Sequence, residues 1–307
     1  MFQITLTSVL QTLLYMIPGF LLCKCKKGAA EHLPTVSGIL IYICSPGLFI
    51  SSFLNLSFSG ENLKMMGLFF LTTLLLQLAF MGLLWLILRK KTEDAATRIL
   101  VIGSVLGNVG FFGQPVLRAI LPDHPEAICY SCMFILSMNL IVFTFGAFCL
   151  TKDKKFISVK AAILNPTTIS FLVAFPLYLL NGNQWMPTLL TDSMTLLGKM
   201  TTPICMIILG MRLSTVSWKK LVSRPHAFFT CLGKLLLFPL FCYAILFFLP
   251  FDPVFKTCVV ILAGTPCASV ILSLAEIYQK GRELSADCLL LSTLLCLATV
   301  PLLSLLI

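Results

Sequence analysis

Charged residues are scarce in this sequence of 307 amino acids. They make up 11% of the chain, against about 25% in an ordinary soluble domain, whereas hydrophobic residues make up 58% and the mean hydropathy is +1.00. A chain with so little polar surface lacks the groups needed to face water. These proportions exclude a soluble enzyme, a nucleic-acid-binding protein and a secreted disulfide scaffold, and they indicate an integral membrane protein.

Acidic residues and histidines are scarcer still, with 12 Asp and Glu and three His in the whole chain. Membrane enzymes that act on lipid head groups usually cluster these residues for metal binding or acid–base catalysis. The sequence has no such cluster and no Gly-x-x-x-x-Gly-Lys-Ser/Thr phosphate loop. We therefore expect no enzyme activity, no metal site and no cofactor. The 13 cysteines are scattered through apolar stretches, which is typical of small buried side chains.

Long apolar runs account for most of the chain. A bilayer core about 30 Å thick needs about 20 apolar residues per helix. Measured this way, the chain predicts an all-α integral membrane protein with ten transmembrane helices and short connections. The predicted spans are residues 3–23, 35–57, 65–88, 99–120, 127–150, 161–180, 188–211, 227–249, 255–278 and 288–307.

The positive charges lie in alternate loops. The opposite loops hold only Lys64, Arg118 and Lys256. Because basic loops stay in the cytoplasm, this bias predicts a multi-pass protein of the plasma membrane with both termini outside. It also explains the net charge of +10 without a nucleic-acid partner. The basic loops contain Lys24, Lys26, Lys27, Arg89, Lys90, Lys91, Arg98, Lys152, Lys154, Lys155, Lys160, Arg212, Lys219, Lys220, Arg224, Lys280 and Arg282.

A weak internal repeat runs through the chain at an offset of 157 residues. It divides the sequence into two five-helix repeats, residues 1–155 and 156–307. Since five is odd, the second repeat must be inverted relative to the first, an architecture typical of secondary transporters. Pro46 and Pro203 are the predicted hinge or packing positions. The matched pairs are Ser45-Pro46 with Thr202-Pro203, Gly107-Asn108 with Gly264-Thr265, and Gln77 with Lys234.

Two of the predicted spans contain helix breakers. Four glycines and Pro115 fall within residues 103–115, and Gly264-Thr265-Pro266 interrupts the ninth span. Gly and Pro destabilise a helix interior by about 1 and 3 kcal/mol. We therefore expect two broken helices that cross near the membrane midplane and direct half-helix N-termini at an anion. The alternative is that the small residues are only helix-packing surfaces.

Polar side chains inside the spans complete the candidate substrate site. Lys199 and Lys234 lie inside apolar runs, where a buried charge is costly and indicates a functional role. Lys234 could instead extend to the cytoplasmic interface. Gln77, Asn139 and Ser269 could line a pathway or make interhelical hydrogen bonds. The predicted substrate-binding residues are Gly107, Asn108, Val109, Gly110, Gly113, Pro115, Gly264, Thr265, Pro266, Ser269, Lys199, Lys234, Gln77 and Asn139.

The stretch Gly107-Asn108-Val109-Gly110-Phe111-Phe112-Gly113-Gln114-Pro115 resembles the fourth-helix signature of the auxin efflux carrier family. The short loop at 151–160 resembles its bacterial branch, which includes permeases for malate and malonate. The resemblance implies crossed fourth and ninth helices, an elevator-type movement and a homodimer. Plant carriers have Asn-Pro at both crossings, whereas this chain has Asn108-Val109 and Thr265-Pro266. Auxin is therefore not the expected substrate.

We accordingly predict a secondary transporter for small organic anions, mono- or dicarboxylates. The coupling ion, H⁺ or Na⁺, is open. A sodium-coupled symporter of the bile-acid type is the alternative within the transporters, and a non-transporting membrane sensor is the alternative outside them.

Overall fold

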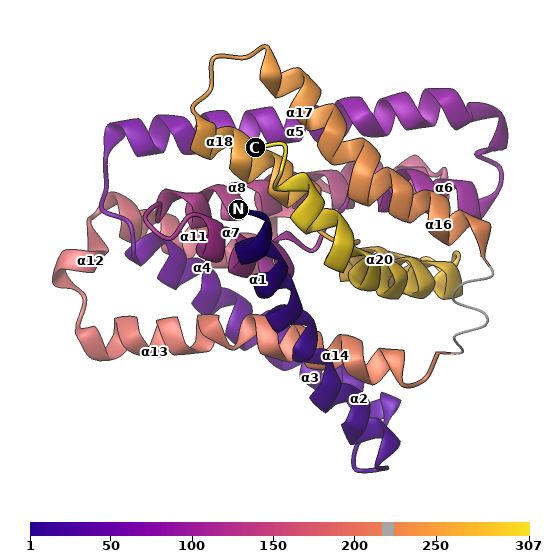
Figure 1. Cartoon of the computed structure of the whole chain (residues 1–307), viewed down its shortest axis with the longest axis horizontal. Helices are drawn as coiled ribbons and strands as arrows, with labels where there is room; N and C mark the ends of the chain where they lie inside the picture. Colours follow the sequence, from indigo (N-terminus) through magenta and orange to yellow (C-terminus); the bar gives the residue numbers. More distant parts are fainter. Residues whose placement is uncertain (217–223) are drawn as a thin grey trace.

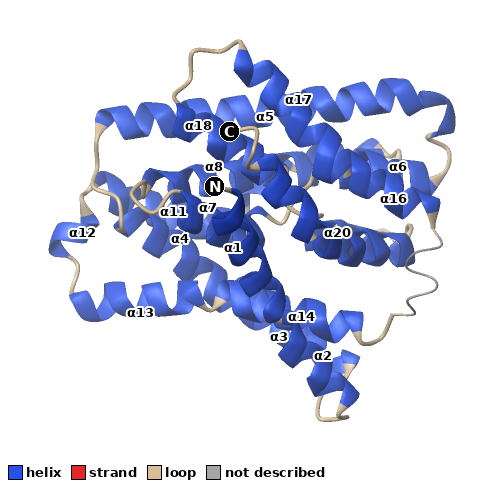
Figure 2. Cartoon of the chain, in the orientation of Figure 1, coloured by secondary structure: helices blue, strands red, loops and turns tan. Residues whose placement is uncertain are grey.

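The computed structural model describes residues 1–216 and 224–307, so Lys219 and Lys220 of the predicted basic loops lie outside the described residues. Within the described ranges the chain is helical and contains no strand (Figures 1 and 2). Up to residue 151 the elements are α1 (Phe2–Leu14), α2 (Met16–Lys24), η1 (Ala30–His32), α3 (Leu33–Ile39), η2 (Leu40–Cys44), α4 (Ser45–Leu54), α5 (Gly60–Leu88), η3 (Arg89–Lys91), α6 (Ala95–Gly103), η4 (Val109–Gly113), α7 (Gln114–Ile120), α8 (Glu126–Ile141), η5 (Val142–Gly146) and α9 (Ala147–Thr151). Beyond it they are η6 (Lys154–Phe156), α10 (Val159–Ile163), α11 (Pro166–Leu179), α12 (Gly182–Trp185), α13 (Thr188–Lys199), α14 (Thr201–Leu213), α16 (Pro225–Leu232), η7 (Gly233–Leu237), α17 (Phe238–Phe247), α18 (Pro253–Ala263), α19 (Ser269–Ile277) and α20 (Arg282–Leu303).

Eight helical segments among the described residues are long and apolar enough to cross a membrane. They coincide with eight of the ten predicted spans, and the other two predicted spans, 99–120 and 255–278, are each broken into shorter helices. Large apolar side chains such as Leu75, Ile87 and Phe247 are exposed, as expected for surfaces in contact with lipid. The eight segments are Phe2–Lys24, Leu33–Leu54, Gly60–Lys91, Glu126–Thr151, Lys154–Leu179, Thr188–Leu213, Pro225–Phe247 and Arg282–Leu303.

The helices pack in two main groups. In the first group α2 and α3 contact α14, and α4 contacts both α11 and α13. In the second group α5 and α18 contact α8, α17 contacts α18, and α16 contacts both α6 and α20. Helix α1 contacts α14 of the first group and α20 of the second, so the two terminal helices lie side by side (Figure 1).

Close helix contacts within the first group depend on glycine. A methyl group on Gly47 of α4 would lie 2.9 Å from the backbone nitrogen of Gly198 on α13, and one on Gly210 of α14 would overlap the carbonyl oxygen of Met16 on α2. Small residues of this kind let membrane helices approach until their backbones touch.

Wide, π-helical turns interrupt several spans next to proline. The segments η2, η4 and η7 each end two residues before a proline, namely Pro46, Pro115 and Pro239. Proline has no N–H and its ring clashes with the carbonyl four residues earlier. A wider turn relieves that clash. The predicted hinge at Pro46 therefore lies beside a real irregularity. Pro203 lies in the first turn of α14, just after the junction with α13 at Met200.

Candidate functional site

The first broken segment runs from α6 to α7. Helix α6 ends at Gly103, and the next helical turn, η4, begins at Val109. Asn108 precedes η4, and its carbonyl oxygen accepts hydrogen bonds from the backbone nitrogens of Phe112 and Gly113, both at 3.2 Å. Five residues, 104–108, therefore leave the helix at the place where the sequence predicts a break.

The second broken segment has the same form, and the two breaks meet. Helix α18 ends at Ala263 and α19 begins at Ser269. The backbone nitrogen of Asn108 donates to the carbonyl oxygen of Pro266 at 2.7 Å, and that of Ala268 donates to Leu106 at 3.0 Å. This antiparallel bridge, centred on Gly107 and Cys267, satisfies backbone groups that lipid could not.

Glycine at position 107 permits this close approach. A methyl group there would overlap the hydroxyl oxygen of Thr265 and lie 2.9 Å from the ammonium nitrogen of Lys234. A methyl group on Gly113 would lie 2.7 Å from Leu262 and 3.0 Å from Thr265. Gly107 and Gly113 are thus positions where the other broken segment leaves no room for a side chain.

Lys234 lies beneath the crossing and is fully buried. Its ammonium group donates a hydrogen bond to the carbonyl oxygen of Ala263, the last residue of α18, and lies 5.1 Å from the ring centre of Phe238. Because the C-terminal end of a helix carries partial negative charge, the lysine is well placed to stabilise it. The side chain does not extend to the cytoplasmic interface.

One cavity of about 420 Å³, which we name the crossing cavity, opens beside the two breaks. Gly110 and Phe111 of η4 line it from one break, and Ser269 and Val270 of α19 line it from the other. The first amide groups of a helix have no partner within the helix, and they carry partial positive charge. Its polar side chains are Tyr42, Ser45, Asn108, Asn139, Asn165, Thr167, Ser269 and Ser273.

The asparagines of the crossing cavity are held by the surrounding helices. Asn108 directs its side-chain amide at the sulfur of Cys205, 3.8 Å away. The amide nitrogen of Asn139 donates to the side-chain oxygen of Asn165 at 3.4 Å, and that oxygen also accepts from the backbone of Thr168. The cavity therefore offers neutral amides and helix N-termini, which suit an oxygen-rich anion.

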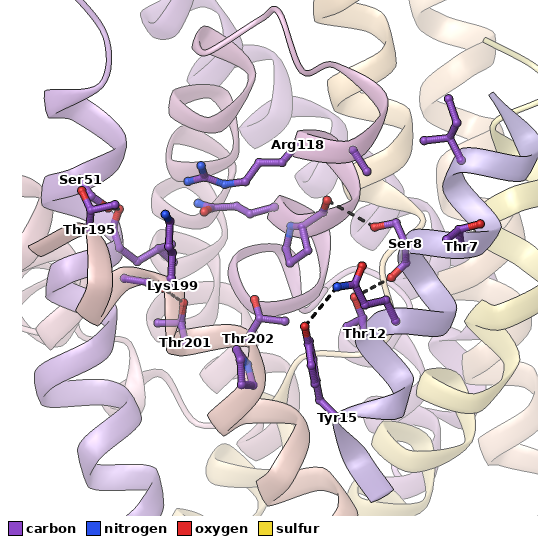
Figure 3. A pocket seen from close by; sticks show the side chains of 18 of the residues that line it. Thr7, Ser8, Thr12, Tyr15, Ser51, Arg118, Thr195, Lys199, Thr201 and Thr202 are labelled. Atoms are coloured by element: carbon purple, nitrogen blue, oxygen red, sulfur yellow. Dashed lines mark hydrogen bonds between the residues drawn. The ribbon is translucent and has the colours of Figure 1, made fainter. Parts of the chain in front are cut away.

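A second cavity of about 760 Å³ lies between α1, α4, α7 and the junction of α13 with α14. We name it the cationic cavity, because Arg118 and Lys199 both line it and both are exposed to it (Figure 3). Leu48 of α4 lines this cavity and the crossing cavity alike, so it separates the two.

Apart from Gln77, the predicted substrate-binding residues and Pro203 fall into three sets. Gly107, Asn108, Val109, Gly110, Asn139 and Ser269 line the crossing cavity. Pro115, Lys199 and Pro203 line the cationic cavity. Gly113, Gly264, Thr265, Pro266 and Lys234 support the crossing from behind, without being among the residues that line either cavity. Their role in substrate binding stays a prediction.

Gln77 lies in a different place, at the contact of α5 with α8. Its side-chain nitrogen donates to the hydroxyl of Ser137 at 2.8 Å and to the carbonyl of Thr73 at 3.0 Å. Among the described contacts, it therefore acts as an interhelical hydrogen-bonding residue, the alternative that the sequence left open.

The repeat offset needs a correction at the crossing. The two half-helices before the breaks end at Gly103 and Ala263, and those after them begin at Val109 and Ser269. Both pairs are 160 residues apart instead of 157. Asn108 thus corresponds to Ala268, and not to Thr265, because helix ends and backbone bonds define the equivalence better than matching residue types.

Sequence reasoning missed Arg118, Gln114 and Asn165. Arg118 was assigned to a loop, although it belongs to the last turn of α7 and lines the cationic cavity. Gln114 immediately precedes Pro115 in the motif at residues 107–115, so the motif itself indicates this position. Asn165 precedes Pro166, the first residue of α11, and its oxygen caps that helix. An Asn-Pro pair at a helix start is a recognisable signal as well.

The number and length of the apolar helices define a multi-pass membrane protein. Comparison with known proteins gives the family: the model of the membrane transport protein family matches residues 4–161 and again residues 152–304. The chain belongs to this family, which is the auxin efflux carrier family that the fourth-span motif resembles. It is similar to an uncharacterized transporter of Methanocaldococcus jannaschii, with 25% identity over 283 residues that cover 89% of each chain.

Proposed function

We propose that the protein is a secondary transporter of small organic anions, mono- or dicarboxylates such as malate or malonate, and that the crossing cavity binds the substrate carboxylate. The observation that carries the proposal is that both half-helix N-termini line one cavity together with Asn108 and Ser269. Two converging N-termini favour an anion, because both carry partial positive charge.

The packing supports alternating access. The crossing cavity is lined on one side by Ser45 and Leu48 from the first helix group, and on the other by Asn108, Asn139 and Ser269 from helices of the second. We propose that the second group, which carries the crossing, moves against the first as an elevator. The ten-span count, the inverted repeats and a homodimer built through the first group belong to this proposal.

Transport assays with reconstituted protein test the proposal. Proteoliposomes should take up radiolabelled malate, malonate or lactate, and Asn108→Ala and Ser269→Ala should each reduce uptake about tenfold or more, since one hydrogen bond to a charged group contributes about 1.5–3 kcal/mol. Asn108→Asp, of nearly the same shape, should reduce it further because its carboxylate repels the substrate. Asn62→Ala, on α5 outside both cavities, is the matched control.

The same assay separates the alternatives. Replacing sodium by choline abolishes uptake in a sodium-coupled symporter, whereas collapse of the pH gradient abolishes it in a proton-coupled carrier. Wild-type protein that carries none of the three anions under any gradient contradicts the transport proposal and favours a sensor. Asn108→Asp that transports as well as wild type contradicts the assignment of the carboxylate site.

A further inference from the structure

We propose that the cationic cavity is a second binding site, which takes small organic dianions through Arg118 and Lys199. The two side chains come from different parts of the fold, Arg118 from α7 and Lys199 from the last residue of α13. In Figure 3 their charged ends extend toward each other within one cavity. This site is separate from the crossing cavity, with Leu48 between them.

The charge of this cavity is not balanced by the protein. All its lining residues lie in the described part of the chain, and none of them is Asp or Glu. Arg118 and Lys199 also belong to none of the ion pairs found among the described residues. Two cations inside one concave surface focus the electrostatic potential there, which attracts and concentrates anions.

Gln114 provides an independent sign of a ligand. Its side chain is 1% exposed and lines the cationic cavity. The amide nitrogen is directed at the sulfur of Cys132, 3.7 Å away, whereas the amide oxygen has no hydrogen-bond partner among the described residues. A buried acceptor left without a donor costs about 1–3 kcal/mol. A hydroxyl group on the ligand, such as the one that malate carries, would supply that donor.

The remaining lining fits a hydrated organic acid. Hydroxyl groups of Ser8, Thr12 and Thr202 lie around the cavity, and Leu48, Pro115 and Pro203 provide apolar surface for a carbon chain. A volume of about 760 Å³ accommodates a four-carbon dicarboxylate with water around it. Because Arg118 and Lys199 are exposed, they can hold one carboxylate each without a large desolvation cost.

The site also bridges the two helix groups. Lys199 belongs to the first group, whereas α7, which carries Arg118, contacts α8 of the second. A dianion bound to both cations would therefore link the groups that we propose to move against each other. The inference rests on the proposed function for the choice of organic acids as ligands, and it adds a preference for dianions over monoanions.

Calorimetry on the detergent-purified full chain tests the site without requiring transport. The probes are succinate and malate as dianions and lactate as a monoanion. Arg118→Gln and Lys199→Gln should each weaken succinate binding about tenfold and lactate binding less, and added salt should reduce the difference. Lys64→Gln, an exposed cation outside both cavities, should bind like wild type. Unfolding temperatures of all variants verify that each is folded.

The outcomes are distinguishable from failure of the transport proposal. Succinate binding that is weakened about tenfold in each of the two variants supports the site even when liposomes show no flux. Binding and transport that both survive in Arg118→Gln and Lys199→Gln, while Asn108→Asp abolishes them, overturn the second site and leave the transport proposal standing. Wild-type protein that binds phosphatidylglycerol but not succinate, with lipid binding weakened in Arg118→Gln, overturns the proposal in favour of a lipid head group.

Discussion

The ammonium group of Lys234 donates a hydrogen bond to the carbonyl oxygen of Ala263, where the half-helix α18 ends. Lysine and carbonyl come from different spans, η7 and α18, and the contact lies directly behind Gly107. A buried cation is expensive in a membrane. Here it offsets the negative end of a broken helix and ties a third element to the crossing.

Replacing this lysine tests whether its charge is structural. Lys234→Met keeps most of the volume but leaves the carbonyl of Ala263 without its donor, so we expect a loss of about 1–3 kcal/mol in unfolding free energy. The measurement is the unfolding temperature in detergent, with Lys64→Met as the exposed control. A variant more stable than wild type would show that burial of the charge costs more than its hydrogen bond contributes.

Gly107→Ala tests the close approach at the crossing. The added methyl group overlaps Thr265 and crowds Lys234, so we expect a destabilisation of about 1–3 kcal/mol, as for overpacked cores, together with lost uptake. Gly67→Ala is the matched control, because a methyl group on Gly67 of α5 meets nothing within 4 Å. Equal stability and uptake of the two variants would contradict the proposed crowding.

Leu48→Ala tests the partition between the two cavities. Truncating the residue that lines both cavities removes the barrier, and we expect anions to leak passively down an imposed gradient. Liposome flux of chloride or succinate measures it. Leu75→Ala, on an exposed face of α5, is the control and should not leak. A tight Leu48→Ala protein would place the barrier elsewhere.

Glu93 provides a pH-dependent contact next to the basic loops. It forms an ion pair with Lys152, and the hydrogen bond and charge of Lys152 lower the pKa of Glu93 below its ordinary value. A lowered folded-state pKa means that the pair stabilises the protein at neutral pH and is lost as the pH falls through that value. Glu93→Gln should therefore lower the unfolding temperature at neutral pH and have little effect in strong acid. Asp123→Asn, at another exposed acid, is the comparison; a loss that persists in acid argues against the pair.

Much of the site's location was predictable from local chemistry. Glycine and proline destabilise a helix wherever they occur, so the breaks near Asn108 and Thr265 were visible without a structure. The offset of 157 that relates the two breaks is wrong by three residues. It matches Gly107 with Gly264 by residue type, whereas the helix ends give an offset of 160. Gln77 is a candidate site residue from its polar side chain inside a predicted span, with an interhelical hydrogen bond as the alternative. Its partner Ser137 lies 60 residues away in the sequence, and no local pattern indicates such a pair.

The scarcity of charge and the length of the apolar runs determined by themselves that this chain resides in a membrane as a helical bundle, because unpaired backbone groups are not tolerated in lipid. The two breaks likewise follow from sequence. Only the tertiary structure decided that Asn108 bonds to Pro266, that Lys234 serves the end of α18, and that Arg118 and Lys199 share a cavity. Those relationships depend on which helices pack side by side. The sequence around one residue does not identify a contact residue that lies far away in the chain.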